Sequence, residues 1–364
     1  MNALAPGCVR DCRGCGHRDL TSAESSAQKT RWLSRTLGAF GALDAIESDG
    51  VRFGYRRKST LRCERVPGGE GHAIGMRIRD RDDDRVLPIP DCPVHSEEVN
   101  EAFRAIARTF PEDLPLVYAI ASGDLLSLVL KQPRDETTVA RAREWWEARR
   151  FASARGAYLN FHPAAGDRIT AKNGWVHLGG EGWGAMRFFG REFRHGPGGF
   201  LQVQAPLYEA ALSRARGFLL RAPGPVADLY SGVGVSLALW REAARETIGV
   251  ELSGEAAEHA RRNSGAAVLQ GKCGERVPQL REFVGDRGFS AFVNPPRTGL
   301  ESEVRRWLAS ERGRVARIAY LSCSAGTLAR DLGELTEAGY RVETLASYDF
   351  FPGTPHVETL ALLT

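Results

Sequence analysis

The second half of the chain alternates helices with short apolar strands, and this alternation constrains the fold more than any other feature. Periodic apolar residues predict helices at 207–220, 236–245, 255–263, 300–310 and 327–339. Short apolar runs predict buried strands at 224–230, 247–252, 289–294 and 317–323, followed by a final pair at 340–351 and 356–364. Such alternation forms a doubly wound α/β sheet, which binds ligands at the carboxyl ends of its strands.

The first half follows a different pattern. A cysteine-rich start precedes a predicted helix that is capped near Ser22 or Ser25 and ends at Gly41. Strand-like runs then dominate, with helices only near 96–110 and 137–150. We therefore expect an α/β protein with three parts: a cysteine segment and basic β region at 1–95, a central α+β domain at 96–195, and a Rossmann-like domain at 196–364.

Composition narrows the functional classes. The chain has 364 residues, of which 43% are hydrophobic, and it contains neither an apolar run of membrane-spanning length nor a signal-peptide pattern. We therefore expect a cytoplasmic protein that makes no membrane contact. Its seven cysteines are an odd number, which argues against a disulfide framework and favours ligands, nucleophiles or buried fillers.

A glycine turn follows the first predicted strand of the Rossmann-like domain, in "DLYSGVG". Gly232 and Gly234 let the backbone approach a ligand, and Glu251 ends the next strand, where a carboxylate can bind the two hydroxyls of a ribose. The third glycine of a dinucleotide fingerprint is missing, so the pattern favours S-adenosylmethionine (SAM) over NAD. The alternative for Glu251 is a helix-capping acid.

Two later strands end in chemically capable residues. Cys323 follows the strand at 317–323 and precedes a helix, whose start stabilises a thiolate. Glu358 lies in "TPHVETL", which we place near the end of the last strand. A nucleophile and an acid on one face suit methylation of a pyrimidine carbon, because a thiolate that adds to C6 makes C5 nucleophilic and a base then removes the C5 proton. For Cys323 the alternative is a buried filler.

The motif "NPPRTG" ends another strand, with Asn294 at the edge of the sheet. In N-methyltransferases an aromatic residue that stacks on the substrate base follows this motif. Here Arg297 follows instead, which disfavours an amino group as the target, and we expect Arg297 to contact RNA. A basic stretch with interleaved aromatics, which includes Arg56, Arg57 and Lys58, also suits single-stranded RNA, although a solvated basic strand is the alternative.

Three cysteines with metal-ligand spacing open the chain: Cys8, Cys12 and Cys15. The same spacing occurs in radical-SAM enzymes, but no strand precedes it here and no barrel follows. Zinc also fits the spacing. We expect Cys63 and Cys273 to be packing residues.

Taken in order, "FLQVQ", "DLYSGVG", "GVE", "NPPRTG", "SCSAGTLARDL" and "DFFPGTPHVE" resemble the RNA uracil-C5 methyltransferases, which are class I SAM-dependent enzymes. The "GYRRKSTLR", "GMRIRD" and "DCPVHS" motifs resemble its iron–sulfur branch, and within it the 23S rRNA enzymes that lack a TRAM domain. The resemblance implies that Cys323 is the nucleophile and Glu358 the base. It implies SAM contacts from Gln202, Tyr230, Glu251 and Asn294, and a [4Fe-4S] cluster on Cys8, Cys12, Cys15 and Cys92.

The function expected is therefore methylation of C5 of a uridine in 23S rRNA, at the uridine 747 site, by an enzyme with a central RNA-binding domain and no obligate protein partner. A tRNA uridine is the second target considered. The alternative outside enzymology is an RNA-binding redox sensor with a cluster and an inert catalytic domain, which an intact Cys323 and Glu358 disfavour.

Overall fold

The alternating half of the chain forms a seven-stranded sheet in the order β12-β11-β10-β13-β14-β16-β15. Its strands are β10 (Val226–Leu229), β11 (Thr247–Glu251), β12 (Ala267–Gln270), β13 (Phe289–Val293), β14 (Val315–Ser322), β15 (Val342–Tyr348) and β16 (Glu358–Leu363). The five neighbouring strands β12, β11, β10, β13 and β14 are parallel to one another, whereas β16 is antiparallel to both β14 and β15. The predicted doubly wound α/β sheet is therefore confirmed.

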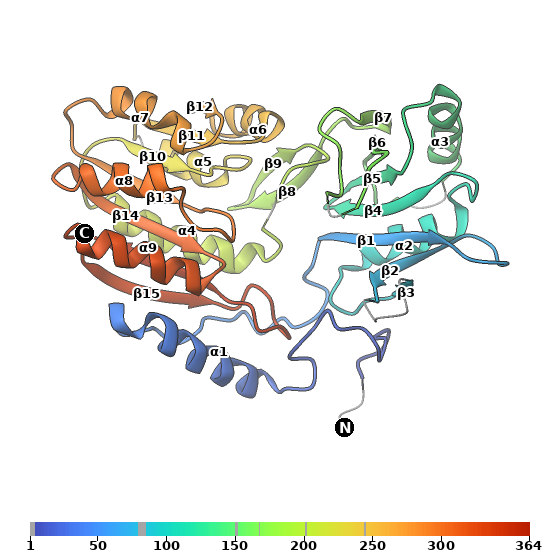
Figure 1. Cartoon of the computed structure of the whole chain (residues 1–364), viewed down its shortest axis with the longest axis horizontal. Helices are drawn as coiled ribbons and strands as arrows, with labels where there is room; N and C mark the ends of the chain where they lie inside the picture. The colour runs from blue at the N-terminus through green and yellow to red at the C-terminus, as the bar shows by residue number, and fades with distance from the viewer. Residues whose placement is uncertain (1–3, 79–84, 150–151, 167, 201, 244) are drawn as a thin grey trace. The chain divides into compact units, whose positions relative to one another are not determined.

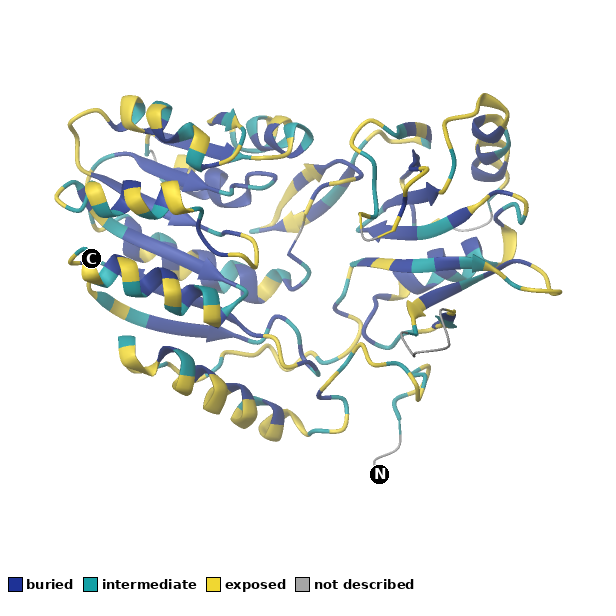
Figure 2. Cartoon of the chain, viewed as in Figure 1, coloured by how far each residue is buried: buried dark blue, intermediate teal, exposed yellow. Residues whose placement is uncertain are grey.

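Helices cover both faces of this sheet, with α8 and α9 in front and α4 and α5 behind in the view of Figure 1. The helices of this half are α4 (Ala205–Leu219), α5 (Val235–Glu242), α6 (Gly254–Ser264), α7 (Val277–Val284), α8 (Ser302–Ser310) and α9 (Ala325–Glu337), with a short 3-10 helix η2 (Gly274–Arg276). Because both faces are covered, the strands are buried along most of their length (Figure 2).

One helix from the N-terminal region also packs on this sheet. Helix α1 (Ser22–Leu37) contributes Leu33 and Leu37 to the core that it shares with α7, α8 and α9. The helix begins one residue earlier than predicted, because Thr21 and Glu24 form a reciprocal capping box. It ends at Leu37, and the 3-10 helix η1 (Gly38–Phe40) follows.

The other large sheet has the strand order β3-β2-β1-β4-β5-β6-β7. Its elements are β1 (Lys58–Arg65), β2 (His72–Arg77), β3 (Val86–Pro88), α2 (Glu97–Thr109), β4 (Leu116–Ser122), β5 (Leu125–Leu130), α3 (Glu136–Ala148), β6 (Gly156–Phe161) and β7 (Trp175–Gly180). Among the described strand pairs of this sheet, only β5 and β6 are parallel, and α3 connects them. Both helices contribute to one core with the sheet, which includes Phe103, Ile106 and Trp146.

The computed structural model describes residues 4–78, 85–149, 152–166, 168–200, 202–243 and 245–364. By its contacts the chain divides into unit 1 (Met1–Cys15, Val51–Met186, Arg194–Val203) and unit 2 (Gly16–Gly50, Arg187–Phe193, Gln204–Thr364). A hairpin of β8 (Gly184–Phe188) and β9 (Arg191–His195) contributes residues to both units. The three-part division stays a prediction. Among the described residues, no helix is both long and apolar enough to cross a membrane.

Candidate active site

A strained turn at the carboxyl end of β10 forms one side of the candidate site in unit 2. Tyr230, Gly232 and Gly234 all adopt positive φ values, of 63°, 54° and 88°. A Cβ at Gly234 would lie 2.9 Å from the Cα of Ala260, so the turn packs tightly against α6 there. At Gly232 a Cβ would meet no described atom within 4 Å. The turn therefore packs against α6 at Gly234 and has no close neighbour among the described residues at Gly232, where the backbone can approach a ligand.

The carboxylate of Glu251 lies against this turn. Its Oε2 accepts the N–H of Gly232 at 3.0 Å, and its Oε1 accepts the N–H of Ser253 at 2.8 Å, just before α6. The second contact resembles the capping role that was the alternative, and the first ties the acid to the glycine turn. Glu251 is thus held at the edge where a ribose would bind, and its ligand contact stays a prediction.

Asn294 lies directly after β13 at the same edge. Its N–H donates to the carbonyl of Leu229 at 3.3 Å, and its side chain lies near enough to the hydroxyl of Tyr208 to lower the pKa of that group. Tyr208 comes from α4 and is buried, and burial raises the pKa of its phenol. No local pattern marks Tyr208 as a site residue, because a tyrosine on the apolar face of a helix is typical of a core residue.

Cys323 and Glu358 meet at the carboxyl edge of the sheet. Ser322 pairs with Thr359 in the antiparallel register of β14 and β16, so the next residues in each direction, Cys323 and Glu358, are opposite one another. Glu358 is the first residue of β16, whereas the prediction placed it near the end of this strand. The expectation was wrong because β16 runs antiparallel, which brings its start to the edge where the parallel strands finish.

Arg297 joins this pair. It lies in the loop after β13, where its guanidinium is near enough to Cys323 and Glu358 to lower the pKa of both. The loop is anchored by Asp331, which is fully buried and accepts the N–H of Leu300 and the hydroxyl of Tyr320, at 2.8 and 2.7 Å. The predicted contact of Arg297 with RNA stays a prediction, and the structure shows in addition that Arg297 lies near the predicted nucleophile and base.

Burial dominates the electrostatics of the pair. Only 3% of Glu358 is exposed, and no described residue hydrogen bonds with its Oε2. Burial raises the pKa of Glu358 to about 8, against a smaller lowering by Arg297. Burial and the charge of Glu358 also raise the pKa of Cys323, whereas Arg297 lowers it. The predicted stabilisation of the thiolate by the start of α9 is therefore outweighed in the free protein.

The four predicted cluster cysteines all belong to unit 1, and none forms a disulfide. Burial raises the pKa of Cys15 and of Cys92, and the negative charges of neighbouring cysteines raise both further. The backbone N–H groups of Val94 and His95 lower the pKa of the Cys92 thiol, against the larger effect of burial. Even so, within the described parts of the chain no three Cys, His, Asp or Glu side chains converge as a metal site. The donor chemistry fits a metal, whereas a closed ligand geometry is not shown.

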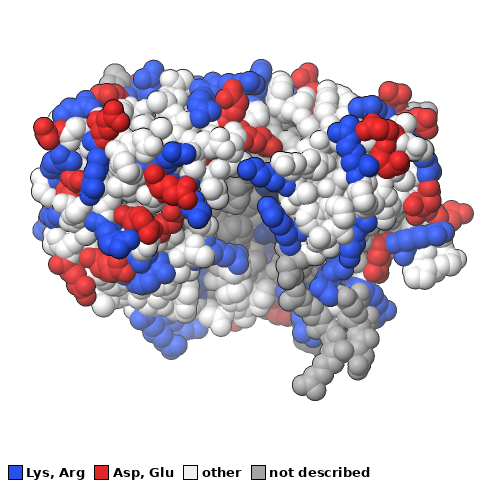
Figure 3. Space-filling model, turned by 45° about the horizontal axis from the view of Figure 1, so that its top comes forward, with Lys and Arg blue, Asp and Glu red and all other residues white. Residues whose placement is uncertain are grey.

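The predicted RNA contacts of the basic strand also lie in unit 1. Arg56 lowers the pKa of Cys15 and Cys92 by its charge, and the amine of Lys58 donates to the carbonyl of Gly199. Arg57 is exposed. On the face shown in Figure 3, basic and acidic side chains are interspersed, so RNA binding would depend on particular residues.

Not all predicted SAM contacts come together in one unit. Tyr230, Gly232, Glu251 and Asn294 share the edge of the sheet in unit 2, whereas Gln202 is a buried residue of unit 1. Cys63 and Cys273 are buried, as expected for packing residues, and Cys273 lies beside Tyr230.

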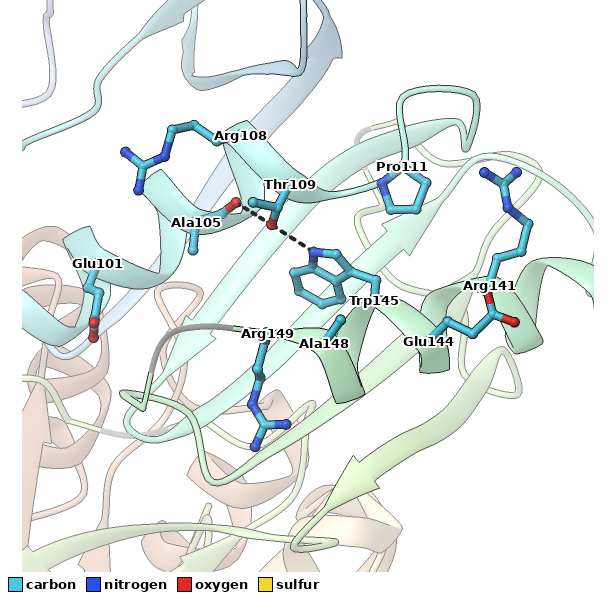
Figure 4. Close-up of a pocket in the computed structure, with 10 residues that line it drawn as sticks. All are labelled: Glu101, Ala105, Arg108, Thr109, Pro111, Arg141, Glu144, Trp145, Ala148 and Arg149. Atoms are coloured by element: carbon cyan, nitrogen blue, oxygen red, sulfur yellow. Dashed lines mark hydrogen bonds between the residues drawn. The ribbon is translucent and has the colours of Figure 1, made fainter.

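A separate cavity of about 490 Å³ lies between α2 and α3 in unit 1 (Figure 4). The indole N–H of Trp145 donates to Thr109 on its wall at 2.9 Å. Arginines 108, 141 and 149 also line it, but none of the predicted site residues does.

Comparison with known proteins agrees with this site. The family model described as tRNA (Uracil-5-)-methyltransferase matches residues 282–364, the segment that contains Asn294, Arg297, Cys323 and Glu358. In fold, the chain is similar to the crystal structure of Pyrococcus abyssi tRNA (uracil-54, C5)-methyltransferase in complex with S-adenosyl-L-homocysteine. The TM-score is 0.76 at 22% identity, over 97% of this chain and 86% of that chain.

Sequence relatives extend the match over nearly the whole chain. An uncharacterized RNA methyltransferase of Parasynechococcus marenigrum (strain WH8102) is 27% identical, over 98% of this chain and 82% of the relative. The 23S rRNA (uracil(1939)-C(5))-methyltransferase RlmD of Pseudomonas aeruginosa (strain UCBPP-PA14) is 30% identical, over 96% of this chain and 78% of the relative. Similarity of this degree and extent shows the family, and the chain belongs to the RNA (uracil-5-)-methyltransferases.

Proposed function

We propose that this enzyme methylates C5 of a uridine in 23S rRNA, with SAM as methyl donor and Cys323 as covalent nucleophile. The observation that carries the proposal is the grouping of Cys323, Arg297 and Glu358 at the same sheet edge as the glycine turn. A nucleophile and a base are the groups that this reaction requires, and Arg297 lowers the pKa of both.

The residues at the edge suit SAM. Gly232 has a positive φ, and no described atom would lie within 4 Å of a Cβ at this position, so a ligand can approach the backbone there. The carboxylate of Glu251, which is held by hydrogen bonds, suits the hydroxyls of a ribose. We propose that Tyr230, Gly232, Glu251 and Asn294 hold SAM, with Gln202 as a further contact. When bound, SAM supplies an electrophilic methyl group.

The chain's own residues then act in sequence. Arg297 favours the thiolate of Cys323, which adds to C6 of uracil and makes C5 nucleophilic. After C5 has gained the methyl group, the carboxylate of Glu358 takes the proton from C5. The electron pair of that C–H bond re-forms the C5–C6 double bond, and the Cys323 thiolate leaves.

We propose 23S rRNA as the substrate because the RlmD enzymes of Pseudomonas, which are similar to this chain, are named as 23S rRNA methyltransferases. The names of these relatives specify uracil 1939, whereas the sequence resemblance favours uridine 747. The labelling experiment below distinguishes the two sites within 23S rRNA. A tRNA uridine is the second candidate, favoured by the description of the family model. We place the reaction in the cytoplasm, where free thiols persist.

We further propose that Cys8, Cys12, Cys15 and Cys92 bind a [4Fe-4S] cluster, as in the iron–sulfur branch. Four free cysteines in one unit, of which Cys8, Cys12 and Cys92 lie near enough to Cys15 to raise its pKa, support this donor set. The role assigned to the cluster is structural, since methyl transfer needs no redox step.

Methylation of defined RNAs with radiolabelled SAM tests the function. We expect label in fragments of 23S rRNA that contain uridine 747 or uridine 1939, and the labelled fragment assigns the site. The Cys323→Ala variant should incorporate none. Label in tRNA transcripts alone would establish the second candidate, and no label in any RNA would favour an RNA-binding sensor with an inert catalytic domain.

A further inference from the structure

A lysine occupies the buried face of helix α1. The buried residues of this helix are Ser25, Lys29, Leu33 and Leu37, which follow one another at intervals of four. The side chain of Lys29 is 0% exposed. Lysine is almost never fully buried unless it is paired, so its presence in a stripe that packs on the sheet requires an explanation.

The partner of Lys29 lies in the segment 349–357, which we call the base loop because it leads into Glu358. The amine of Lys29 donates to Oδ1 of Asp349 at 2.6 Å and to the carbonyl oxygen of Phe351 at 3.4 Å. Asp349 follows β15, and Tyr348 pairs with Glu358 across the two strands. The lysine therefore holds the end of the loop that enters from β15.

A second attachment holds the middle of the base loop. The N–H of His17 donates to the carbonyl of Gly353 at 2.9 Å, and the His17 ring hydrogen bonds with Ser25 of α1, also at 2.9 Å. Within the loop, Thr354 donates to Phe351 at 2.8 Å. The start of α1 and the base loop thus form one hydrogen-bonded assembly within unit 2.

A buried ion pair is a poor way to add stability. Apolar residues of similar volume often serve as well or better, because two charges must lose their water. The pair does restrict direction, since Lys29 bonds with a carboxylate and a carbonyl at fixed places in the loop. An apolar side chain would leave the loop free to shift against α1.

We infer that Lys29 is a positioning residue for proton removal, which holds the base loop so that Glu358 stays opposite Cys323. This inference rests on the proposed function, in which Glu358 is the base. A displacement of about 1 Å in a catalytic group can slow a step by about a hundredfold. Loss of Lys29 should therefore slow the release step and leave SAM binding unchanged, because the turn after β10 is not part of the base loop.

The test compares Lys29→Met, Asp349→Asn and the double variant with wild type. Lys131→Met is the matched control, because Lys131 is exposed and forms no ion pair with a described residue. We would measure kcat, the KM values for RNA and SAM, the melting temperature, and the fraction of protein held as a covalent RNA adduct on a denaturing gel.

For Lys29→Met we expect kcat to fall about tenfold or more, KM values to stay within about twofold, and adduct to accumulate. The double variant should be no worse than Lys29→Met, because the two residues act through one contact. A lower kcat without adduct, or unchanged kcat, would overturn the positioning role. If Lys29→Met does not fold, Lys29→Arg replaces it, since a retained cation of different reach should still accumulate adduct.

The Glu358→Gln variant separates this inference from the proposed function. It should itself trap adduct, because it lacks the base. If Glu358→Gln traps adduct and neither Lys29 variant does, the positioning role alone fails. If Glu358→Gln traps none while Cys323 still reacts, the assignment of the base fails, and the inference fails with it.

Discussion

Replacement of Glu358 by glutamine should stabilise the protein, and the gain should grow with pH. Glu358 is buried without a described partner for Oε2, and burial raises its pKa from 4.5 to about 8. One pKa unit corresponds to about 1.4 kcal/mol, so ionisation in place costs roughly 5 kcal/mol of folding free energy. The other interactions of the fold must therefore offset the free energy of unfolding that is lost when Glu358 ionises.

The pH window follows from the two pKa values. Between about 4.5 and 8 the folded protein keeps the proton of Glu358 while the unfolded chain has lost it, so stability falls as pH rises through this range. Above about pH 8 both states are ionised, and the penalty is constant. Glutamine cannot ionise, so the variant escapes the penalty and keeps only the cost of a buried polar group, which does not vary with pH.

Urea unfolding of wild type and Glu358→Gln, at about pH 5 and pH 9, measures this difference. We expect the advantage of the variant to increase by roughly 2–4 kcal/mol between the two pH values, since relaxation around the carboxylate recovers part of the cost. The control is Glu337→Gln, because Glu337 is exposed at the end of α9. An advantage that is the same at both pH values would refute the reasoning and show that Glu358 ionises normally in the folded protein.

Other variants test separate parts of the site. Arg297→Met should move the pH–rate profile to higher pH and lower kcat at neutral pH about tenfold or more, because the guanidinium lowers the pKa of both Cys323 and Glu358; an unchanged profile would contradict its placement. In wild type, the rate of adduct release should rise with pH up to about 8 in single-turnover experiments, as Glu358 ionises. Cys323→Ala should abolish turnover yet bind SAM within about twofold of wild type by calorimetry. Cys92→Ser, purified anaerobically, should lose iron relative to a wild type with about four irons; full iron content would assign the fourth ligand elsewhere.

The sheet and most of its edge could be predicted from the sequence. Alternating apolar periods predict parallel strands, and the carboxyl ends of parallel strands share one edge, so Glu251, Asn294 and Cys323 were expected together. Each lies at or just after the end of its own strand, in β11, β13 and β14. This part of the prediction needed only the direction of the chain and the handedness of its connections.

The remaining features depend on contacts between distant segments, which no local pattern encodes. The sequence located α1 but not its packing on the catalytic sheet, because its buried stripe includes Lys29, which looks polar until Asp349 is brought beside it, 320 residues away. Arg297 is similar: an exposed arginine after a proline pair suits RNA as well as it suits a thiol. The register of β14 and β16 brings Cys323 and Glu358 together, and Arg297 lies near enough to both to affect their ionisation.

Arg297 affects the ionisation of two acidic groups, Cys323 and Glu358, whose charges change at different steps of the proposed reaction. A negative charge on Cys323 or Glu358 disfavours a charge on the other, and the single guanidinium is shared between them. In the proposed mechanism the thiolate acts first, and its charge disappears when sulfur bonds to C6. Burial and Arg297 alone set the pKa of Glu358 at about 8, with no contribution from a thiolate, so Glu358 should ionise in the adduct as it does in the free enzyme, and proton removal should follow that ionisation.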